Sequence, residues 1–200
     1  MIVADAMTTP AVVVGPQTHV KRALEILDAR QVTALPVVSG GRLVGMVSER
    51  DLIKGALPRD LEHHVGVLPP EGAPRPGLTV AGVMAANPVS VCSDTDLASA
   101  VELMERHAVK SLPVLDRDAR VCGILSRRDI VRVLATPDVQ IATALSARLT
   151  LKSDWRIRVI DGVAHVSGPR TASERALARA TGLATPGVME VVIDPPGGCG

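Results

Sequence analysis

The sequence contains no phenylalanine and no tyrosine, and its 200 residues include a single tryptophan. Hydrophobic residues still make up 46% of the chain, so the cores must be built from aliphatic side chains and methionine. Small aliphatic side chains suit several small α/β units better than one core centred on aromatic rings. The scarcity of rings also removes the stacking platforms on which proteins bind single-stranded nucleic acid.

An excess of charge of one sign is also missing. Lys and Arg number 22, Asp and Glu number 21, and the formal net charge is +1. Such a balance provides no broad basic field for the phosphates of a nucleic acid. We therefore expect no nucleic-acid partner.

Long apolar runs and a secretion signal are absent too. No apolar run approaches the ~20 residues that a membrane-spanning helix needs. The stretch MIVADAMTTP at the start has no basic segment followed by an apolar one. The sequence therefore predicts a cytoplasmic protein.

What the sequence does contain is an internal repeat. The stretch RLVGMVSERDLIK at residues 42–54 matches RVCGILSRRDIVR at residues 120–132. In the same way, VTALPVV at residues 32–38 matches VKSLPVL at residues 109–115. The chain therefore holds two copies of one structural unit.

Upstream of these stretches, apolar residues recur at i, i+3, i+4 and i+7 in each copy. They are Val20, Ala23, Leu24 and Leu27 in the first copy, and Leu97, Ala100, Val101 and Met104 in the second. This spacing predicts one amphipathic helix per copy. Thr18 and Thr95 precede the two stripes and are the expected N-caps.

Each copy then reads as strand, hairpin, strand and helix. In the first copy, apolar runs at residues 35–38 and 43–47 flank the turn SGGR. In the second, runs at residues 112–115 and 121–125 flank DRDAR. Two such units can bury their sheets by packing against each other, which predicts a two-fold-like pair.

Both closing helices follow a serine that lies three residues before an aspartate: Ser48 with Asp51, and Ser126 with Asp129. One interpretation is structural, because such a pair forms a capping box in favourable alignment with the helix dipole. The other is functional. A helix N-terminus attracts phosphate, and a carboxylate one turn along can accept hydrogen bonds from both ribose hydroxyls. Capping can coexist with nucleotide binding.

The segments LPVV…GRLVGMVSERDL and LPVL…RVCGILSRRDI resemble the CBS domain family, the cystathionine β-synthase-type repeats that occur in tandem. The resemblance covers about residues 1–135. It implies a Bateman module of α/β (α+β) fold, in which two repeats pack as a pseudo-two-fold pair and their clefts bind adenosine-containing ligands. AMP, ADP, ATP and S-adenosylmethionine are the implied ligands, none of them a catalytic cofactor. The resemblance also implies a homodimer through the CBS repeats.

The resemblance carries roles to named residues of this chain. Asp51 and Asp129 would hold ribose, with Ser48 and Ser126 beside them. The backbone at Thr33 and Ala34, and at Lys110 and Ser111, would lie near the purine. The cations that could neutralise phosphate, or could equally be solvated helix residues, are Arg127, Arg128, Arg132 and Lys54.

The stretch PPEGAPRPG is rich in proline and glycine and predicts an exposed linker between the copies. We expect a first repeat over residues 1–60, a linker over 61–78 and a second repeat over 79–137. His63 and His64 precede the proline-rich stretch, but no cysteine or carboxylate cluster accompanies them, so we predict no metal site.

The cysteines do not read as a chemical site. They lack close metal-type spacing, and their odd number argues against a disulfide framework. Cys92 aligns with Val14 and Cys122 with Val44, so both are interpreted as small buried hydrophobic residues. Cys199 lies in a terminal tail over residues 196–200.

A different pattern follows Pro137. A helical stripe is formed by Ile141, Ala142, Leu145 and Leu149. Asp161 and Gly162 mark a hairpin. Thr171 to Glu174 form the capping box of a helix that ends at Gly182, and VMEVVI is the last strand. The predicted order is αββαβ over residues 138–195.

This segment resembles the BON family (bacterial OsmY and nodulation) through IDGVAHVSGPRTASER and ATPGVMEVVID. The resemblance implies contact with phospholipid or association with a protein. Only Arg156 and Arg158 form a compact basic strand face, and each basic residue adds only about 1 kcal/mol of adhesion to anionic lipid. An unknown protein partner is therefore favoured over a membrane.

No catalytic motif is present: the sequence lacks a P-loop, a Gly-x-Ser-x-Gly elbow, His-Glu-x-x-His and a Rossmann fingerprint. We therefore expect no enzyme. The first hypothesis is a regulatory sensor of an adenine nucleotide or S-adenosylmethionine. The alternative is a ligand-free adaptor homodimer whose BON-like domain recruits a protein or phospholipid.

Overall fold

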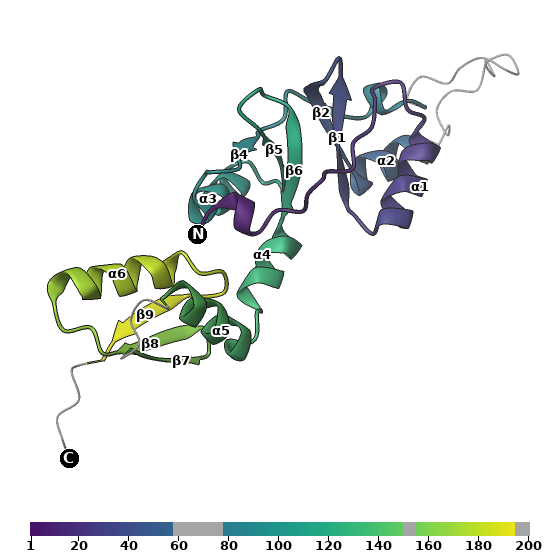
Figure 1. Ribbon diagram of the computed structural model, residues 1–200. Helices are drawn as coiled ribbons and strands as arrows, with labels where there is room; N and C mark the ends of the chain where they lie inside the picture. The colour runs from purple at the N-terminus through teal and green to yellow at the C-terminus, as the bar shows by residue number, and fades with distance from the viewer. Residues whose placement is uncertain (58–77, 150–154, 195–200) are drawn as a thin grey trace, which may run out of the picture. The chain divides into compact units, whose positions relative to one another are not determined.

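The computed structural model describes residues 1–57, 78–149 and 155–194 (Figure 1). The chain forms two compact units by its internal contacts: Thr8–Ser93 with Met104–Ile124, and Met1–Met7 with Asp94–Leu103 and the chain from Leu125 onward. The predicted linker except Leu78, together with His63 and His64, lies outside the described residues. The predicted tail, with Cys199, also lies outside them.

The first repeat has the predicted order of elements. They are η1 (Val3–Asp5), α1 (Val20–Arg30), β1 (Ala34–Ser39), β2 (Arg42–Ser48) and α2 (Glu49–Ala56). β1 and β2 pair antiparallel, and β3 (Ala85–Ala86) adds to β2. Gly40 and Gly41 take φ values of +56° and +78° in the hairpin turn, a left-handed conformation that glycine adopts at little cost.

An aliphatic core holds this repeat together, as the composition predicted. The predicted stripe residues Val20, Ala23 and Leu27 are buried on α1 and pack against residues of both strands and of α2. The other buried members are Val14, Leu35, Val37, Val47, Leu52 and Val80. Full burial of a leucine or valine stabilises a fold by roughly 1.5–3 kcal/mol, so these side chains fix α2 behind the hairpin.

The second repeat follows the same order. Its elements are η2 (Val80–Gly82), β4 (Val91–Cys92), α3 (Leu97–Arg106), β5 (Ser111–Leu115), β6 (Val121–Ser126) and α4 (Arg127–Leu134). The sheet order is β4-β5-β6, with β4 parallel to β5. The Asp116 carboxylate stabilises the turn after β5 by accepting hydrogen bonds from the Asp118 and Arg120 amides, both at 2.9 Å.

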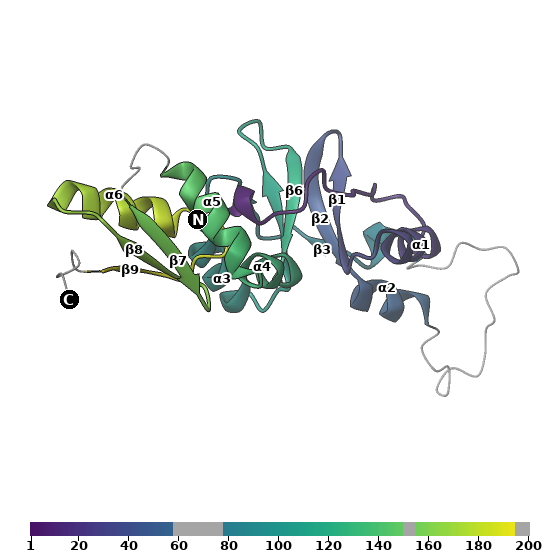
Figure 2. The same ribbon diagram turned by 60° about the horizontal axis from the view of Figure 1, so that its bottom comes forward.

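The chain after Pro137 forms the predicted αββαβ order. Its elements are α5 (Asp138–Arg148), β7 (Arg156–Ile160), β8 (Val163–Ser167), α6 (Ala172–Leu183) and β9 (Glu190–Ile193). β7 and β8 are antiparallel, and β8 and β9 are parallel. Helices α5 and α6 lie on one face of this sheet (Figures 1 and 2). We call residues 138–149 and 155–194 the C-terminal segment.

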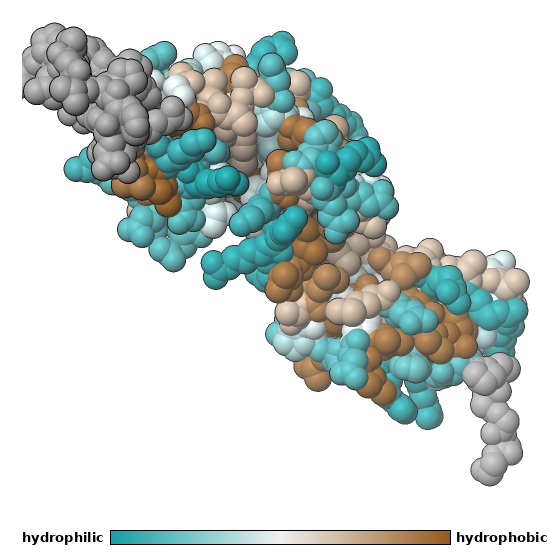
Figure 3. All heavy atoms as spheres, turned by 180° about the vertical axis from the view of Figure 1, so that it is seen from behind, coloured by the Kyte–Doolittle hydropathy of each residue, from teal (hydrophilic) through white to brown (hydrophobic). Residues whose placement is uncertain are grey.

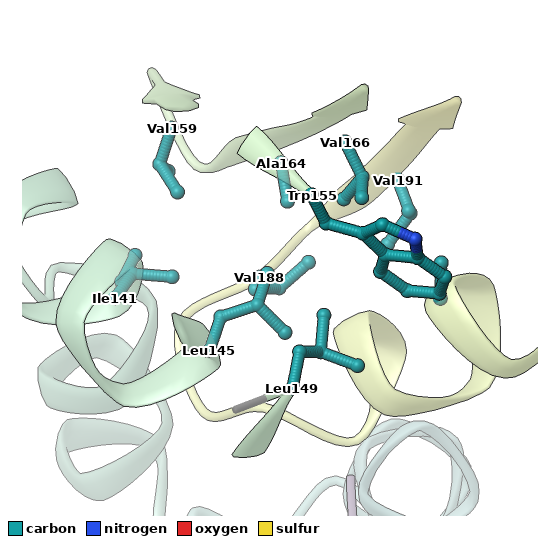
Figure 4. Packing of buried hydrophobic residues seen from close by; sticks show 10 residues of the cluster. Ile141, Leu145, Leu149, Trp155, Val159, Ala164, Val166, Val188 and Val191 are labelled. Carbon is teal, nitrogen blue, oxygen red and sulfur yellow. The ribbon is translucent and has the colours of Figure 1, made fainter. Parts of the chain in front are cut away.

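The core of the C-terminal segment lies between those two helices and the sheet (Figure 4). Ile141 and Leu145 lie on α5, and Leu149 directly follows this helix. The Trp155 ring packs in the same cluster. Val166 and Val191 come from β8 and β9. The only aromatic ring of the sequence other than histidine therefore serves a structural core.

Four local expectations were wrong. His19, not Thr18, is the N-cap of α1, while Thr18 Oγ1 accepts a hydrogen bond from the Gly15 amide at 3.2 Å. Thr95 was the expected N-cap of α3. Instead, the Asp96 carboxylate caps this helix by accepting hydrogen bonds from the amides of Ala98 and Ser99, at 3.0 and 3.3 Å. A carboxylate is the stronger cap because its charge also aligns with the helix dipole.

The other two concern the burial of the cysteines and the end of helix α6. Cys92 is exposed because Val91, and not Cys92, is the counterpart of Val14: Val14 pairs with Val37, Val91 pairs with the equivalent Val114, and both Val14 and Val91 are buried. Cys122 is half-buried, as Val44 is in the first repeat. Helix α6 continues one residue past Gly182 to Leu183. Gly182 is there for close packing, since a Cβ at this position would lie 2.5 Å from Val191 Cγ2.

Candidate functional site

The start of helix α2 carries the first predicted serine–aspartate pair. The Ser48 amide donates to Oδ2 of Asp51 at 3.0 Å, and the Ser48 hydroxyl donates to the same oxygen at 2.6 Å. In return, the Asp51 amide donates to Ser48 Oγ at 3.3 Å. The predicted capping box is confirmed, and it uses one carboxylate oxygen of Asp51.

The hairpin places the other predicted residues of the first repeat beside this cap. Ala34 pairs with Ser48 across β1 and β2. The Thr33 carbonyl accepts a hydrogen bond from the amide of Glu49, the first residue of α2, at 2.9 Å. The structure therefore brings Thr33, Ala34, Ser48 and Asp51 together, with Thr33 exposed and Asp51 half-buried.

The start of helix α4 repeats this geometry. The Ser126 amide and hydroxyl donate to Oδ2 of Asp129 at 2.8 and 2.5 Å, and the Asp129 amide donates to Ser126 Oγ at 3.3 Å. This second capping box is confirmed as well. The Asp129 side chain is nearly buried, with 7% of its surface exposed.

Asp129 differs from Asp51 in its charge partner. Arg132 Nη2 donates to Asp129 Oδ1 at 2.7 Å, and the same nitrogen lies 3.5 Å from the Ala6 carbonyl oxygen. The sequence interpretation treated Arg132 as a phosphate-neutralising or solvated cation and missed this ion pair. The available signal was the i, i+3 spacing of Asp129 and Arg132 on one helix.

The remaining predicted residues of the second repeat are distributed differently. Lys110 is exposed just before β5, and Ser111 is the buried first residue of that strand. Both belong to the unit that contains Thr8–Ser93, whereas Ser126, Arg127 and Asp129 belong to the other unit. Arg127 is exposed at the start of α4.

Cys122 has the features of an unreactive thiol. Burial raises the pKa of Cys122, and the negative charge of Asp116 raises it further. Its Sγ donates to the Val114 carbonyl oxygen at 3.4 Å. Because the thiolate is the nucleophilic form, Cys122 is not an activated nucleophile.

Among residues 1–57, 78–149 and 155–194, no group of three or more His, Cys, Asp or Glu side chains is placed to hold a metal ion. In the same part of the chain, no helix has both the length and the hydropathy needed to cross a bilayer.

The family model of the CBS domain matches residues 3–57 and residues 80–136. These two matches contain both serine–aspartate pairs and together span more than half of the chain. The protein therefore belongs to the CBS domain family, and its fold includes a CBS pair.

Known proteins support this assignment. The CBS domain-containing protein YhcV of Bacillus subtilis is 31% identical over 128 residues, which are 64% of this chain and 81% of YhcV. Inosine-5'-monophosphate dehydrogenase of Thermoplasma acidophilum is 24% identical over 138 residues, which are 69% of this chain and 24% of that protein. The chain thus spans only about a quarter of the dehydrogenase.

One similar solved structure contains a bound nucleotide. The crystal structure of CBSX2, a protein of Arabidopsis thaliana, in complex with AMP is similar to this chain at 31% identity and a TM-score of 0.52. The similarity covers 66% of this chain and 93% of that chain. In that crystal structure, CBSX2 is in complex with AMP.

Proposed function

We propose that this protein is a regulatory module that binds an adenine nucleotide or a related adenosyl compound, with AMP as the first ligand to test. The observation that carries the proposal is the pair of serine–aspartate caps at equivalent places in two CBS repeats. The AMP complex of CBSX2, a 31% identical protein, supports the choice of AMP. ADP, ATP and S-adenosylmethionine are the other candidates.

The first repeat offers suitable chemistry for each part of a nucleotide. The cap uses Oδ2 of Asp51, and no described residue bonds its Oδ1, which can accept hydrogen bonds from ribose hydroxyls. Thr33 and Ala34 border Ser48 and offer backbone groups to a purine. The first amides of α2 attract phosphate, and exposed Lys54 adds positive charge.

In the second repeat, Ser126 and Asp129 are candidates for ribose binding by the same reasoning. Lys110 and Ser111 are the candidates for purine contact, and Arg127 is the candidate for phosphate. These roles depend on the family resemblance together with the repeated cap geometry.

Ligand binding would act by shifting an equilibrium between arrangements of the protein. A ligand can shift such an equilibrium only by the difference between its affinities for the two arrangements. In this proposal the shift passes to a partner protein or to the BON-like C-terminal segment. The ligand regulates, and the chain performs no catalytic step.

We also propose that the CBS repeats form a homodimer. Exposed apolar side chains on the two closing helices support this proposal. Val131 on α4 is 63% exposed, and Leu134 on the same helix and Ile53 on α2 are also exposed. Covering such side chains in a second copy would remove apolar surface from water, which favours association.

A ligand-free adaptor is the second candidate function. Hydrophobic residues reach the surface of the C-terminal segment in the space-filling view (Figure 3). Leu177, Leu183 and Met189 are each more than two-fifths exposed there. Arg156 and Arg158 are exposed on β7, so the segment could contact a protein or an anionic phospholipid surface.

Isothermal titration of the full chain with AMP, ATP and S-adenosylmethionine distinguishes the two functions. The sensor predicts binding heat with at least one ligand, and loss of that heat in a variant carrying both Asp51→Ala and Asp129→Ala. Asp28→Ala is the matched control, because Asp28 is an exposed aspartate on α1 and belongs to neither cap. Circular dichroism of each variant reports folding. No heat with any of the three ligands would favour the adaptor.

A further inference from the structure

The two serine–aspartate caps differ in the cation that lies three residues after the aspartate. The first repeat has Lys54 there, and the second has Arg132. Arg132 pairs with Oδ1 of Asp129 at 2.7 Å. Among the described residues, no hydrogen bond or ion pair reaches Oδ1 of Asp51, and Lys54 is exposed.

This difference decides which carboxylate has an oxygen available for a ribose. In Asp51, the cap occupies Oδ2 and leaves Oδ1 without a described partner. In Asp129, the cap occupies Oδ2 and the guanidinium occupies Oδ1. A ribose hydroxyl that approached Oδ1 of Asp129 would have to compete with a charge-assisted hydrogen bond, which belongs to the stronger class.

Burial makes that exchange unfavourable. Only 7% of the Asp129 side chain is exposed, so its charge has little water around it. A nearly buried carboxylate that loses its cation is strongly destabilised. Ribose hydroxyls are neutral donors and cannot replace the positive charge. Asp51 is half-buried, so water already shares in stabilising its charge.

We propose that the Arg132–Asp129 ion pair closes the second repeat to nucleotides, and that the chain binds one nucleotide, through Asp51. This inference depends on the proposed nucleotide-binding function and assigns it to one of the two repeats. The guanidinium of arginine suits this closing role because its planar, fixed donors hold a carboxylate more rigidly than a lysine ammonium does.

Two variants of the test, Arg132→Lys and Lys54→Arg, exchange the cations between the repeats and leave the charge of the chain unchanged. AMP is titrated calorimetrically into the wild type, Arg132→Lys, Lys54→Arg, Asp51→Asn and Asp129→Asn. We expect one AMP per wild-type chain and two per Arg132→Lys chain. Asp51→Asn should weaken binding about tenfold or more, since charge-assisted hydrogen bonds are lost. Lys54→Arg should weaken it too, and Asp129→Asn should weaken it less than Asp51→Asn does.

Several results would overturn the assignment while leaving the nucleotide-binding function intact. They are two AMP molecules per wild-type chain, loss of binding in Asp129→Asn with retention in Asp51→Asn, or one AMP per folded Arg132→Lys chain. If Arg132→Lys fails to fold in circular dichroism, the Lys54→Arg and aspartate variants decide the question. Absence of AMP, ATP and S-adenosylmethionine binding to the wild type would instead overturn the proposed function, and this inference with it.

Discussion

Asp51 and Asp129 have equivalent neighbours along the chain but different partners in space. The Ser-x-x-Asp pattern predicted both capping boxes, and both are confirmed. The pattern did not predict the partner of Asp129, because Lys54 has the same spacing from Asp51 and no bond joins those two among the described residues. Sequence spacing shows which residues share a helix face, while rotamers and packing decide which of them meet.

The cysteines show a second limit of prediction from the sequence, again at the scale of the single residue. Alignment with Val14 and Val44 of the first repeat predicted two buried positions, yet Cys92 is exposed and Cys122 is half-buried. The strand pairing shows that Val91, and not Cys92, is the counterpart of Val14, because Val14 pairs with Val37 and Val91 pairs with the equivalent Val114. Val91 is buried, and Cys92 is the next residue of the strand, where side chains alternate between the two faces. Val44 is itself half-buried, as Cys122 is, so the burial assumed for the first repeat was also wrong at that position.

We expect Cys122 to react slowly with iodoacetamide at neutral pH in a Cys199→Ser variant. Burial and the charge of Asp116 raise its pKa, so little of the reactive thiolate is present. The labelling rate should rise as the pH passes the ordinary pKa of a cysteine thiol, and it should continue to rise above that pH. Mass spectrometry of tryptic peptides gives the rate, with exposed Cys92 as the internal comparison. Labelling of Cys122 at neutral pH as fast as that of Cys92 would contradict this expectation.

At the scale of helices and strands, hydrophobic periodicity was the reliable signal. The stripes predicted α1, α3 and α5, and the turn at Asp161 and Gly162 predicted the β7–β8 hairpin, where the two residues take φ values of +50° and +76°. Helix starts were less predictable, since Asp96 and not Thr95 caps α3. Several polar residues near a helix start compete for the same amides, and geometry selects one of them.

Gly182 provides a test of packing between α6 and β9. Alanine normally stabilises a helix by up to about 1 kcal/mol relative to glycine. Here we expect Gly182→Ala to destabilise the protein by about 1–3 kcal/mol, because overpacking forces a shift of neighbouring atoms. The structural reason is the 2.5 Å approach of the added Cβ to Val191 Cγ2. Urea unfolding measures the change.

Two controls accompany that measurement. In a Val191→Ala background, Gly182→Ala should lower the free energy of unfolding by less than it does in the wild type, since the clashing methyl group is gone. Ala180→Ser, at an exposed position of the same helix, should have little effect. A Gly182→Ala protein more stable than the wild type would show that α6 and β9 are not packed this closely.

At the scale of the whole molecule, the internal repeat predicted the CBS family, and the family match at residues 3–57 and 80–136 confirms it. The αββαβ order after Pro137 was predicted too. The BON resemblance of that segment and the domain boundaries stay predictions. Periodicity records which face of an element is apolar, but it does not record which surface of another unit covers that face.

If the protein is a homodimer through the CBS repeats, one substitution of an exposed valine should lower the molecular mass of the particle in solution, and another should not. Val131→Glu on α4 should convert the dimer toward monomer, because the interface would then have to bury an unpaired charge. Val139→Glu on α5 is the control, since Val139 is also an exposed helical valine but lies outside the CBS repeats. Light scattering coupled to gel filtration gives the masses. A wild-type monomer, or a dimer unaffected by Val131→Glu, would count against the dimer.

A crystal structure of the full chain grown with AMP tests the sensor most directly. We expect AMP in the first repeat, with ribose hydroxyls donating to Oδ1 of Asp51 and the purine along the backbone of Thr33 and Ala34. The ion pair of Arg132 with Asp129 should be retained. AMP bound away from both serine–aspartate pairs, with Asp51 facing bulk solvent, would contradict it.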